Sequence, residues 1–394
     1  MTCLAVINAG SSSIKCALYA LKPDAGLQLL ASGEIDAIGS APHFAAKDGE
    51  GRQLAIRTWD GDEPYGQMLE HLLDWIEEQA GPERLIAVGH RVVHGGLAYA
   101  APQRVTPAVM AELRAAIALA PLHQPHNLAP IDALTKRHPH LPQVACFDTA
   151  FHATNSAVAR MYGLPYALSE QGLRRFGFHG LSYEFIAGEL ERLDPGAAHG
   201  RTVVAHLGSG ASLCALVNGK SVATTMGMSA LDGLVMGTRC GELDPGVVLY
   251  LLRETGMRAE EIETMLYQQS GLLGVSGISA DMHALLASAD ERARTAVELF
   301  VYRAAREIGS MAAAAGGIDA LVFTAGIGEH AAQVRTRICE QSAWLGVRLD
   351  LQANAAGAGK ISAPDSAVAV WVIATDEQLM VARHTLALVG EPHA

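Results

Sequence analysis

The sequence of 394 residues has little that would point to disulfides, to nucleic acid or to a membrane. Its six cysteines are scattered and form no CxxC pair; they are Cys3, Cys16, Cys146, Cys214, Cys240 and Cys339. Most of them lie in apolar, strand-like runs, which predicts small buried thiols in a reducing compartment. Cys240 follows Arg239, so a thiol of depressed pKa is an alternative there, but no neighbouring base supports it.

Positively charged residues are also fewer than negatively charged ones. The net charge is −12, and lysine and arginine form no basic patch, which argues against a nucleic-acid partner. An anionic ligand must then be held by a few local cations and by backbone groups. No apolar run is long enough to span a bilayer, and the first residues lack a signal-peptide layout. We therefore expect no membrane partner and a cytoplasmic location.

The composition that remains is that of an ordinary globular chain, with 50% hydrophobic and 18% charged residues. A chain of this length exceeds what one core usually organises, so we expect two domains. Apolar periodicity predicts helices at 65–79 and at 290–315, and Thr106-Pro107 is typical of a helix start. Further strands are predicted at 85–88, 143–147, 318–323 and 368–373, and a last helix at 378–388.

A predicted hairpin near the start of the chain is the first functional signal. Residues 4–7 and 14–19 are apolar runs separated by Gly10-Ser11-Ser12-Ser13. This turn offers what an oligophosphate needs, namely backbone N–H groups, small hydroxyls and Lys15 just beyond. Ordinary hairpins with serines in water share this pattern, so the segment alone leaves both interpretations open.

A second copy of the pattern favours the phosphate interpretation. Residues 203–216 align with the first hairpin without gaps, so that Gly10 matches Gly208 and Ser11 matches Ser209. Asn218-Gly219 then predicts a turn into a third strand at 220–224. Two such units predict a duplicated fold with one phosphate loop in each half.

Polar residues also follow predicted strands. Asp148 follows the strand at 143–147, and the Gly-rich segment 324–329 lies between a strand and a helix that begins at about His330. Ligands of open α/β sheets bind at such strand ends. The segment 122–127 is predicted to be a loop rich in imidazole and amide groups. Hydrogen-bonding histidines are favoured there over a metal site, because no further Cys/His cluster completes one.

Other phosphate and catalytic motifs do not fit. Gly359-Lys360 lacks the spacing of a P-loop, Gly208-Ser209-Gly210 lacks the third glycine of a dinucleotide fingerprint, and no G-x-S-x-G elbow occurs. Two phosphate hairpins remain, with strand-end carboxylates and with Arg91 and Arg239 in glycine-flanked loops. Phosphoryl transfer needs this set, so the sequence predicts a kinase.

Six blocks resemble, in order, the signatures of the acetate kinase family, and they extend over essentially the whole chain. They are VINAGSSSIK at 6–15, GHRVVHGG at 89–96, FDTAFH at 147–152, GFHG at 177–180, MGTR at 236–239 and FTAGIGE at 323–329. The resemblance implies an α/β fold of two duplicated ribonuclease-H-like domains, of the actin/Hsc70 ATPase type, around a central cleft. Residues 1–150 with about 378–394 would form the acyl-substrate and phosphate-loop domain, and residues 151–377 the nucleotide-binding domain. A homodimer is also implied.

The resemblance also implies roles for individual residues. Asn8 and Glu377 would hold Mg²⁺ (or Mn²⁺), largely through water. The catalytic residues would be Arg91, Asp148, His179 and Arg239. The triphosphate and nucleoside of ATP would be bound by Ser11, Ser12, Ser13, Lys15, His206, Leu207, Gly208, Ser209, Gly210, Asp281, Met282, His283, Gly326, Ile327, Gly328, Glu329 and His330. The acid would be bound by Arg91, Val93, Leu122, His123, Phe178 and Ala230.

The chain departs from the family pattern at several positions. Ser209, His283 and His330 stand where the family usually has Asn, Arg and Asn, and all three are implied to touch the nucleotide. Ala230 stands where the family has a proline, which leaves room for roughly one more methylene in the acyl pocket. We therefore expect acetate phosphorylation by ATP, with propionate accepted well. The alternatives are a kinase for propionate or another short-chain acid, and a non-catalytic actin/Hsc70-like nucleotide-binding protein.

Overall fold

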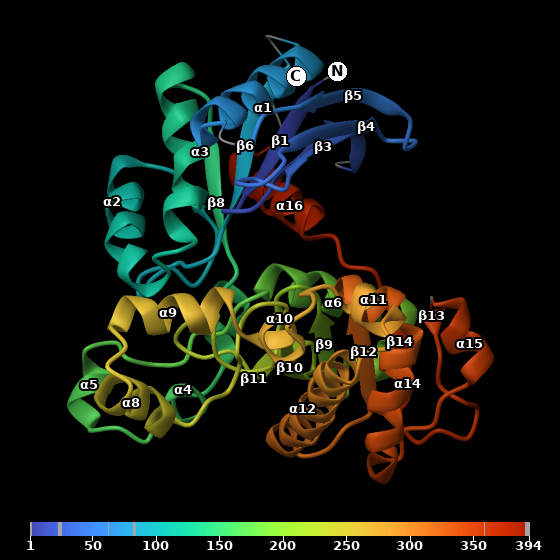
Figure 1. Cartoon of the computed structure of the whole chain (residues 1–394). Coiled ribbons are helices and arrows are strands. Elements are labelled where there is room, and N and C mark those ends of the chain that lie inside the picture. Colours follow the sequence, from blue (N-terminus) through green and yellow to red (C-terminus); the bar gives the residue numbers. More distant parts are fainter. Residues whose placement is uncertain (1, 23–25, 62, 82–83, 358, 391–394) are drawn as a thin grey trace. The chain divides into compact units, whose positions relative to one another are not determined.

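The computed structural model describes residues 2–22, 26–61, 63–81, 84–357 and 359–390. The chain divides into two compact units (Figure 1). Unit 1 comprises Met1–Ala150 and Asp376–Ala394, and unit 2 comprises Phe151–Thr375. Among the described residues, no helix is both long and apolar enough to cross a membrane.

Unit 1 is built on an eight-stranded sheet of order β5-β4-β3-β2-β1-β6-β8-β7. The strands are β1 (Cys3–Ala9), β2 (Ile14–Leu21), β3 (Leu27–Asp36), β4 (His43–Asp48), β5 (Gln53–Thr58), β6 (Leu85–Val92), β7 (Gln103–Arg104) and β8 (Gln143–Phe147). Strands β1 to β5 form an antiparallel meander, whereas β6 pairs in parallel with both β1 and β8. The predicted opening hairpin is confirmed, and the polar segment after it supplies three further strands.

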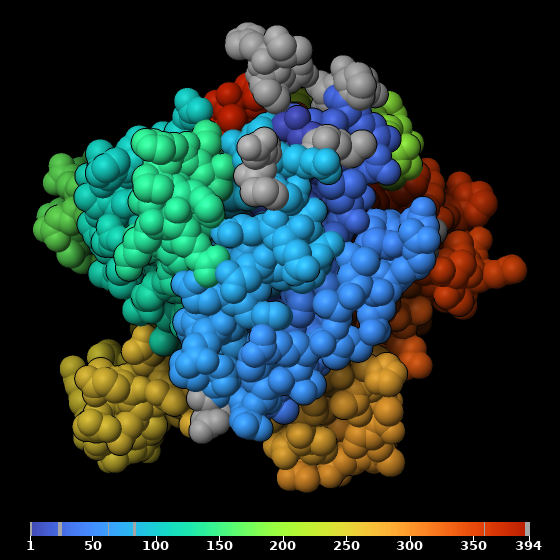
Figure 2. Space-filling model, turned by 90° about the horizontal axis from the view of Figure 1, so that it is seen from above, coloured from blue at the N-terminus to red at the C-terminus, as the bar shows by residue number. Residues whose placement is uncertain are grey.

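Helices cover both faces of this sheet. They are α1 (Tyr65–Ala80), α2 (Pro107–Ala115), η1 (Ala116–Leu119), α3 (Gln124–Arg137) and α16 (Glu377–Val389). Alternate residues of β1, such as Ile7, pack into a core cluster with Leu72 of α1 and Leu134 of α3. On the other face Gly89 of β6 lets α16 approach, since a Cβ there would lie 2.2 Å from Oγ1 of Thr385. Figure 2 shows the surface of unit 1 on which α1 lies, in light blue.

Unit 2 is built on a six-stranded sheet of order β11-β10-β9-β12-β14-β13. The strands are β9 (Arg201–Leu207), β10 (Ala211–Val217), β11 (Lys220–Thr224), β12 (Ala320–Thr324), β13 (Gly359–Lys360) and β14 (Ala369–Val372). The order β11-β10-β9-β12-β14 repeats β3-β2-β1-β6-β8 of unit 1, with an antiparallel hairpin followed by parallel strands. The predicted α/β class and its duplication are confirmed.

The remaining helices occur between Ala150 and Ala356, and the long α12 packs on β9 and β10. They are η2 (Ala150–Thr154), α4 (Ala157–Arg160), α5 (Tyr166–Glu170), α6 (Gly180–Leu193), α7 (Pro195–Ala198), α8 (Pro245–Glu254), α9 (Ala259–Gln268), α10 (Gly271–Ser276), α11 (Met282–Ala287), α12 (Glu291–Ala315), α13 (Ala325–His330), α14 (Ala332–Gln341), η3 (Ala343–Leu345) and α15 (Leu351–Ala356). Both ends of α12 are capped. The side chain of Asp290 accepts from the Arg292 N–H at its start, and Gly316 adopts φ +74° at its end.

Three local predictions are wrong. Arg91 does not lie in a glycine-flanked loop but on β6. Residues 124–127 are not loop but the first turn of α3, which Pro125 favours because its fixed φ suits the start of a helix. The Gly-rich segment after β12 is not an open turn either, because Ala325–His330 form α13. There Glu329 accepts a hydrogen bond from the N–H of Ala325 at 2.8 Å, which satisfies a helix-start donor despite the two glycines.

Candidate active site

Arg91 is the centre of a charged cluster in unit 1. It lies on β6 opposite Cys146 of β8, and Asp148 follows β8 at the same sheet edge. Arg91 Nε and Nη2 donate to the two carboxylate oxygens of Asp148 at 3.0 and 2.6 Å. Nη1 donates to Asn8 Oδ1, on the neighbouring strand β1, at 3.1 Å. Parallel strands that end together therefore bring three of the predicted site residues into contact.

The cluster keeps its charges although it is largely buried. The side chain of Asp148 is 1% exposed and that of Arg91 20%. Burial opposes the guanidinium charge, but the attraction of Asp148 and Glu377 and the hydrogen bond to Asp148 prevail, so the pKa of Arg91 is raised above its ordinary value. A bidentate pair of this kind fixes the plane of the guanidinium as well as its charge.

Glu377 is the first residue of α16, and its Oε2 lies 3.5 Å from Arg91 Nε. The two predicted metal ligands, Asn8 and Glu377, thus both contact Arg91. Their oxygen atoms are hard donors of the kind that Mg²⁺ prefers. Within the described residues, no group of three or more His, Cys, Asp or Glu is arranged to hold a metal ion by itself.

The first Gly/Ser turn is tied down through its carbonyl groups. Ser13 O accepts from the Gly10 N–H at 2.8 Å, and Ser12 O accepts from the Ile38 N–H at 3.1 Å. Tyr65 of α1 donates its hydroxyl to Gly10 O at 3.2 Å. The serine side chains at 11 and 12 are exposed, and that at 13 is half-buried. The hydroxyl groups of Ser11 and Ser12 are therefore accessible from solvent, as a phosphate site requires.

Lys15 has a partner that the sequence did not predict. Its Nζ lies 3.0 Å from Oε1 of Glu34, and both side chains are about half exposed. The two residues are opposite each other on β2 and β3. An exposed pair of this kind is weak, so it would not prevent Lys15 from meeting a phosphate.

In unit 2 His179 occupies a strained position before α6. Its φ is +58°, in the left-handed region that side chains other than glycine rarely adopt. Its Nδ1 is 2.8 Å from Oγ of Ser212 on β10, which is itself 2.5 Å from the hydroxyl of Tyr183. Non-glycine residues kept in this region are often found at functional sites, where the surrounding structure holds them.

The second Gly/Ser turn lies against two of the predicted catalytic residues. A Cβ on Gly210 would stand 3.1 Å from Arg239 Nη2 and 3.2 Å from His179 Nε2. Arg239 Nη1 also donates to the carbonyl of Ala230 at 2.7 Å. The ring of His179 stacks on that of His206, with centroids 4.2 Å apart. Unit 2 therefore brings an imidazole and a guanidinium to the turn at which the sequence predicts phosphate.

The other predicted nucleotide residues differ in exposure. Ser209, Asp281, His283, Gly326 and His330 are exposed. Leu207 and Gly208 end β9 and begin the turn, and Ile327 is half-buried. Met282 is 3% exposed, so its side chain packs in the core. Gly328 is buried, and the carboxylate of Glu329 accepts from backbone N–H groups at 325 and 375.

The predicted acyl-pocket residues come from both units. Val93, Leu122 and His123 belong to unit 1, and Phe178 and Ala230 to unit 2. Val93 and Phe178 are buried, and the other three are half-buried.

Several residues that shape the site were missed from the sequence. Ser212 and Tyr183 position His179, and Ser182 Oγ lies 2.9 Å from His206 Nδ1. Ser182 and Tyr183 lie on the first turn of α6, directly after the GFHG block, so their closeness to the site could have been predicted from the sequence. The pairing of Glu34 with Lys15 could not have been predicted, because it depends on the register of β2 and β3.

The cysteines behave as predicted. All six are free, five are buried and Cys240 is half-buried. Burial raises the pKa of Cys16, Cys214 and Cys339 to about 12. Burial also raises the pKa of Cys240, which argues against an activated thiol beside Arg239.

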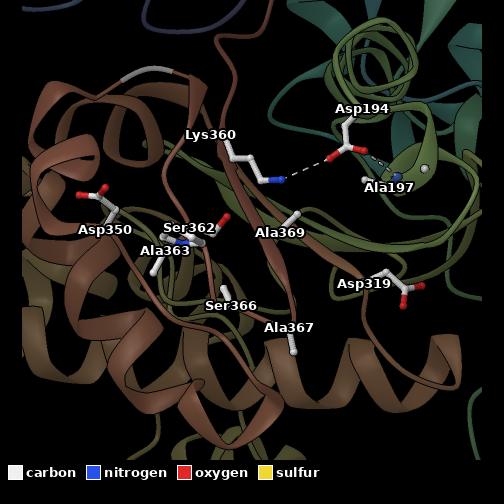
Figure 3. A pocket seen from close by; sticks show the side chains of 12 residues that line it. Asp194, Ala197, Asp319, Asp350, Lys360, Ser362, Ala363, Ser366, Ala367 and Ala369 are labelled. Carbon is white, nitrogen blue, oxygen red and sulfur yellow. Dashed lines mark hydrogen bonds and ion pairs between the residues drawn. The ribbon is translucent and has the colours of Figure 1, made fainter.

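A hollow of about 590 Å³ on unit 2 lies apart from these residues (Figure 3). Three aspartates line it, but each carboxylate has a local structural partner. Asp194 caps α7, Asp319 is held by Arg201, and Asp350 caps α15. Lys360 Nζ lies 3.9 Å from Asp194 Oδ2. These three carboxylates therefore serve the local structure, and the hollow is not a candidate ligand site.

Known proteins match this chain over nearly its whole length. The family model described as the Acetokinase family matches residues 3–383. An acetate kinase from Rhodopseudomonas palustris is 59% identical over 386 residues, 97% of each chain, and one from Rhizobium meliloti is 48% identical over the full length of both.

Two solved structures have nearly the same fold. A propionate kinase from Francisella tularensis superposes with a TM-score of 0.90 at 37% identity and covers 98% of this chain and 100% of that one. An acetate kinase from Porphyromonas gingivalis gives a TM-score of 0.87 at 35% identity and covers 99% and 100%. The family model and these relatives cover nearly the whole chain, and the chain therefore belongs to the acetokinase family.

Proposed function

We propose that this protein is an acetate kinase, which transfers the γ-phosphoryl group of ATP to a carboxylate oxygen of acetate. The products are acetyl phosphate and ADP. The new bond joins the carboxylate oxygen to phosphorus, the bond to the β,γ-bridging oxygen breaks, and no proton is consumed. The observation that carries the proposal is the Arg91 guanidinium, fixed by Asp148 and Asn8 at the ends of three parallel strands.

Arg91 is proposed to bind the carboxylate of the acid and the phosphoryl group in transfer. Its bonds to Asp148 and Asn8 use three of the five N–H groups of the guanidinium. The other two are directed away from these partners and suit an anion. Because a carboxylate is a weak nucleophile, orientation against a fixed cation would supply much of the rate enhancement. In this role Asp148 orients Arg91.

The residues of unit 2 are proposed to act on the triphosphate. The N–H groups at 208–210 would bind phosphate oxygens, and Arg239 and His179 would stabilise the charge that develops on the equatorial oxygens. The hydrogen bond between Ser212 Oγ and Nδ1 fixes the orientation of the His179 ring, while Nε2 lies at Gly210. The exposed His283 and His330 are the proposed nucleoside contacts, and Ser11, Ser12, Ser13 and Lys15 of unit 1 the proposed phosphate contacts.

The donor set in unit 1 fits a magnesium ion. Asn8 Oδ1 and the Glu377 carboxylate are hard oxygen ligands, and Mg²⁺ usually takes one or two carboxylates and keeps several waters. When bound, Mg²⁺ (or Mn²⁺) would neutralise charge on the β- and γ-phosphates. Both residues already contact Arg91, so the ion and the guanidinium would share one carboxylate and one amide.

Acetate is the proposed substrate, and propionate is expected to be accepted well. The relatives named acetate kinase reach 59% identity, against 37% for the solved propionate kinase. The small side chain of Ala230, where the family has proline, favours tolerance of one more methylene. A kcat/KM for acetate more than about a hundred-fold above that for propionate would contradict this expectation, since one methylene is usually worth 10- to 200-fold.

The experiment that tests the function traps the acyl phosphate with hydroxylamine in the presence of ATP, Mg²⁺ and acetate, propionate or butyrate. We expect hydroxamate with acetate and propionate. Arg91→Ala and Arg239→Ala should each lose at least ~10²-fold in kcat. The matched control is Arg192→Ala, since Arg192 is exposed and contacts only Glu189 among the described residues. Absence of hydroxamate with every acid would favour the non-catalytic nucleotide-binding alternative.

We also propose a homodimer that associates through apolar residues of unit 2. Helix α8 has ten residues and none of them is buried, although Val247, Leu249, Tyr250 and Leu252 are apolar or aromatic. Helices α4 and α5 and their connection expose Val158, Met161, Leu164 and Tyr166. Exposed apolar residues gathered in this way are typical of association surfaces. A cytoplasmic location is proposed as well, because the six thiols are free and ATP is the phosphoryl donor.

A further inference from the structure

The carboxamide of Asn127 joins the two strands that carry Asn8 and Arg91. Its Nδ2 donates to the carbonyl of Ala9 at 2.6 Å, and its Oδ1 accepts from the N–H of Val93 at 2.8 Å. Ala9 directly follows Asn8, and Val93 lies two residues after Arg91. Asn127 itself is 2% exposed, so both hydrogen bonds are made away from water.

The link occurs where the backbone pairing of the two strands has ended. The parallel register of β1 and β6 runs only as far as Ile7 opposite His90. Beyond that point the side chain of Asn127 supplies the donor and the acceptor that a neighbouring strand would otherwise provide. A buried backbone group left without a partner is costly, so the carboxamide fixes how far the two strands separate.

The same turn of α3 contacts the site at two further points. The ring of His126 lies 4.8 Å from that of Tyr65, which donates to Gly10 O in the first Gly/Ser turn. Gln124 donates to the carbonyl of His94 at 2.9 Å and accepts from its N–H at 3.3 Å. Polar residues of one helical turn thus contact both the support of the first Gly/Ser turn and the chain that follows Arg91.

We propose that Asn127 is a positioning residue, which sets the spacing between Asn8 with the Gly10–Ser13 turn and Arg91. The proposal rests on the proposed function, because these are the groups that would bind the metal, the phosphates and the acid. Asparagine suits the position because its side chain offers a donor at one end and an acceptor at the other. Aspartate has the same shape but cannot donate to Ala9 O.

The test compares Asn127→Ala and Asn127→Asp with wild type, at a temperature well below the unfolding transition of each. We expect kcat to fall at least ~10-fold in both variants, because small misplacements of reacting groups are costly. The KM for ATP should change less than kcat does, because Asn127 acts on the proposed phosphate contacts of unit 1, whereas the proposed nucleoside contacts lie in unit 2. The aspartate variant should be no better than the alanine variant, although it preserves shape.

The matched control is Gln143→Ala, which removes another buried carboxamide from unit 1. Gln143 contacts His90 Nε2 at 2.8 Å, Ile131 O at 3.3 Å and Thr135 Oγ1 at 2.9 Å, and it joins neither Ala9 nor Val93. We expect it to lower the melting temperature while kcat stays within about threefold of wild type. A kcat near wild type in both Asn127 variants, or an equal loss in the control, would overturn the proposal.

A second measurement separates this proposal from the proposed function, since it requires no activity. Deuterium uptake is followed in peptides covering residues 8–13 and 91–95 of wild type and Asn127→Ala. We expect faster exchange in both peptides, and no change in peptides from β9 and β10 of unit 2. Unaltered exchange at 8–13 and 91–95 would contradict the positioning role. A wild type that makes no acyl phosphate would instead contradict the function.

Discussion

Asp148 shows how much of the proposed chemistry depends on a single side chain. It is almost fully buried, and both of its oxygens accept from Arg91. Removing its charge while keeping its shape would leave the guanidinium with a weaker and less symmetric partner, because an amide accepts through one oxygen only. A substitution of Asp148 that keeps its shape therefore tests the effect of its charge separately from that of its packing.

We predict that Asp148→Asn loses at least ~10²-fold in kcat, since the orientation of Arg91 would no longer be fixed. Circular dichroism and the melting temperature should show that the variant is folded. The measurement is steady-state kinetics with acetate and ATP. Turnover like that of wild type would show that the carboxylate charge is dispensable, and the role assigned to Asp148 would be wrong.

His152 is a second buried residue that acts on the site through another group. Its Nε2 donates to the carbonyl of Phe178 at 2.9 Å, next to His179, and its Nδ1 lies 2.8 Å from Ser221 Oγ. Burial disfavours the charged imidazolium and lowers the pKa of His152 to about 4.

This depressed pKa predicts a pH dependence of stability. The unfolded chain takes up the proton near pH 6.5 and the folded chain only near 4, so the free energy of unfolding falls as the pH drops through that interval. At pH 5 the loss due to His152 should be about 2 kcal/mol. We predict that His152→Gln loses correspondingly less stability than wild type between pH 7 and pH 5, as measured by urea unfolding.

At the scale of elements, the packing of α16 on β6 depends on the absence of a side chain at Gly89. A Cβ there would meet Oγ1 of Thr385 at 2.2 Å and Cγ1 of Val381 at 2.7 Å. Helix α16 also carries Glu377, which contacts Arg91. A change at this contact should therefore affect both stability and the site.

We predict that Gly89→Ala destabilises the protein by about 1–3 kcal/mol, the usual cost of overpacking a core, and that it lowers kcat through Glu377. The matched control is Gly66→Ala in α1, where a Cβ would meet nothing within 4 Å. Alanine favours helix there, so the control should be neutral or slightly stabilising. Urea unfolding of both variants provides the measurement, and equal stability of the two would contradict the close approach of α16.

Elements with strong local signals were predictable from the sequence. Asn218-Gly219 specified the turn between β10 and β11, and Thr106 caps α2 through its hydroxyl as its place before Pro107 indicates. The helical start of α3 was missed because Gln124, His126 and Asn127 interrupt any apolar periodicity. These side chains are polar because they bond to backbone of other elements, and such long-range partners leave no local pattern.

The same distinction applies to the site. The blocks around Arg91, Asp148 and His179 were visible in the sequence, and the structure gives the contacts of each. The pairing of Lys15 with Glu34 and the hydrogen bond of Ser212 to His179 were not visible, because each joins residues brought together by strand register or by packing. Motifs identify the reacting groups, whereas their partners require the fold.

At the scale of the whole molecule, the apolar surface of unit 2 predicts self-association. We predict that Tyr250→Glu weakens the proposed dimer, because a charge would have to be buried at the interface. Sedimentation velocity of wild type and variant over a range of concentrations provides the measurement. Tyr250 is 60% exposed, and the control Ile56→Glu changes a residue of unit 1 that is 61% exposed. A wild type that sediments as a monomer at every concentration would refute the dimer.

The division of the chain has a consequence for the order of events during synthesis. Helix α16 packs on β1, β6 and β8 of unit 1, yet it follows all of unit 2 in the chain. Once the first 150 residues have left the ribosome, Arg91 can already meet Asp148 and Asn8, but Glu377 has not yet been added. Unit 1 therefore lacks α16 on one face of its sheet until some 225 further residues have been translated. Completion of the charged cluster is thereby tied to the production of both halves.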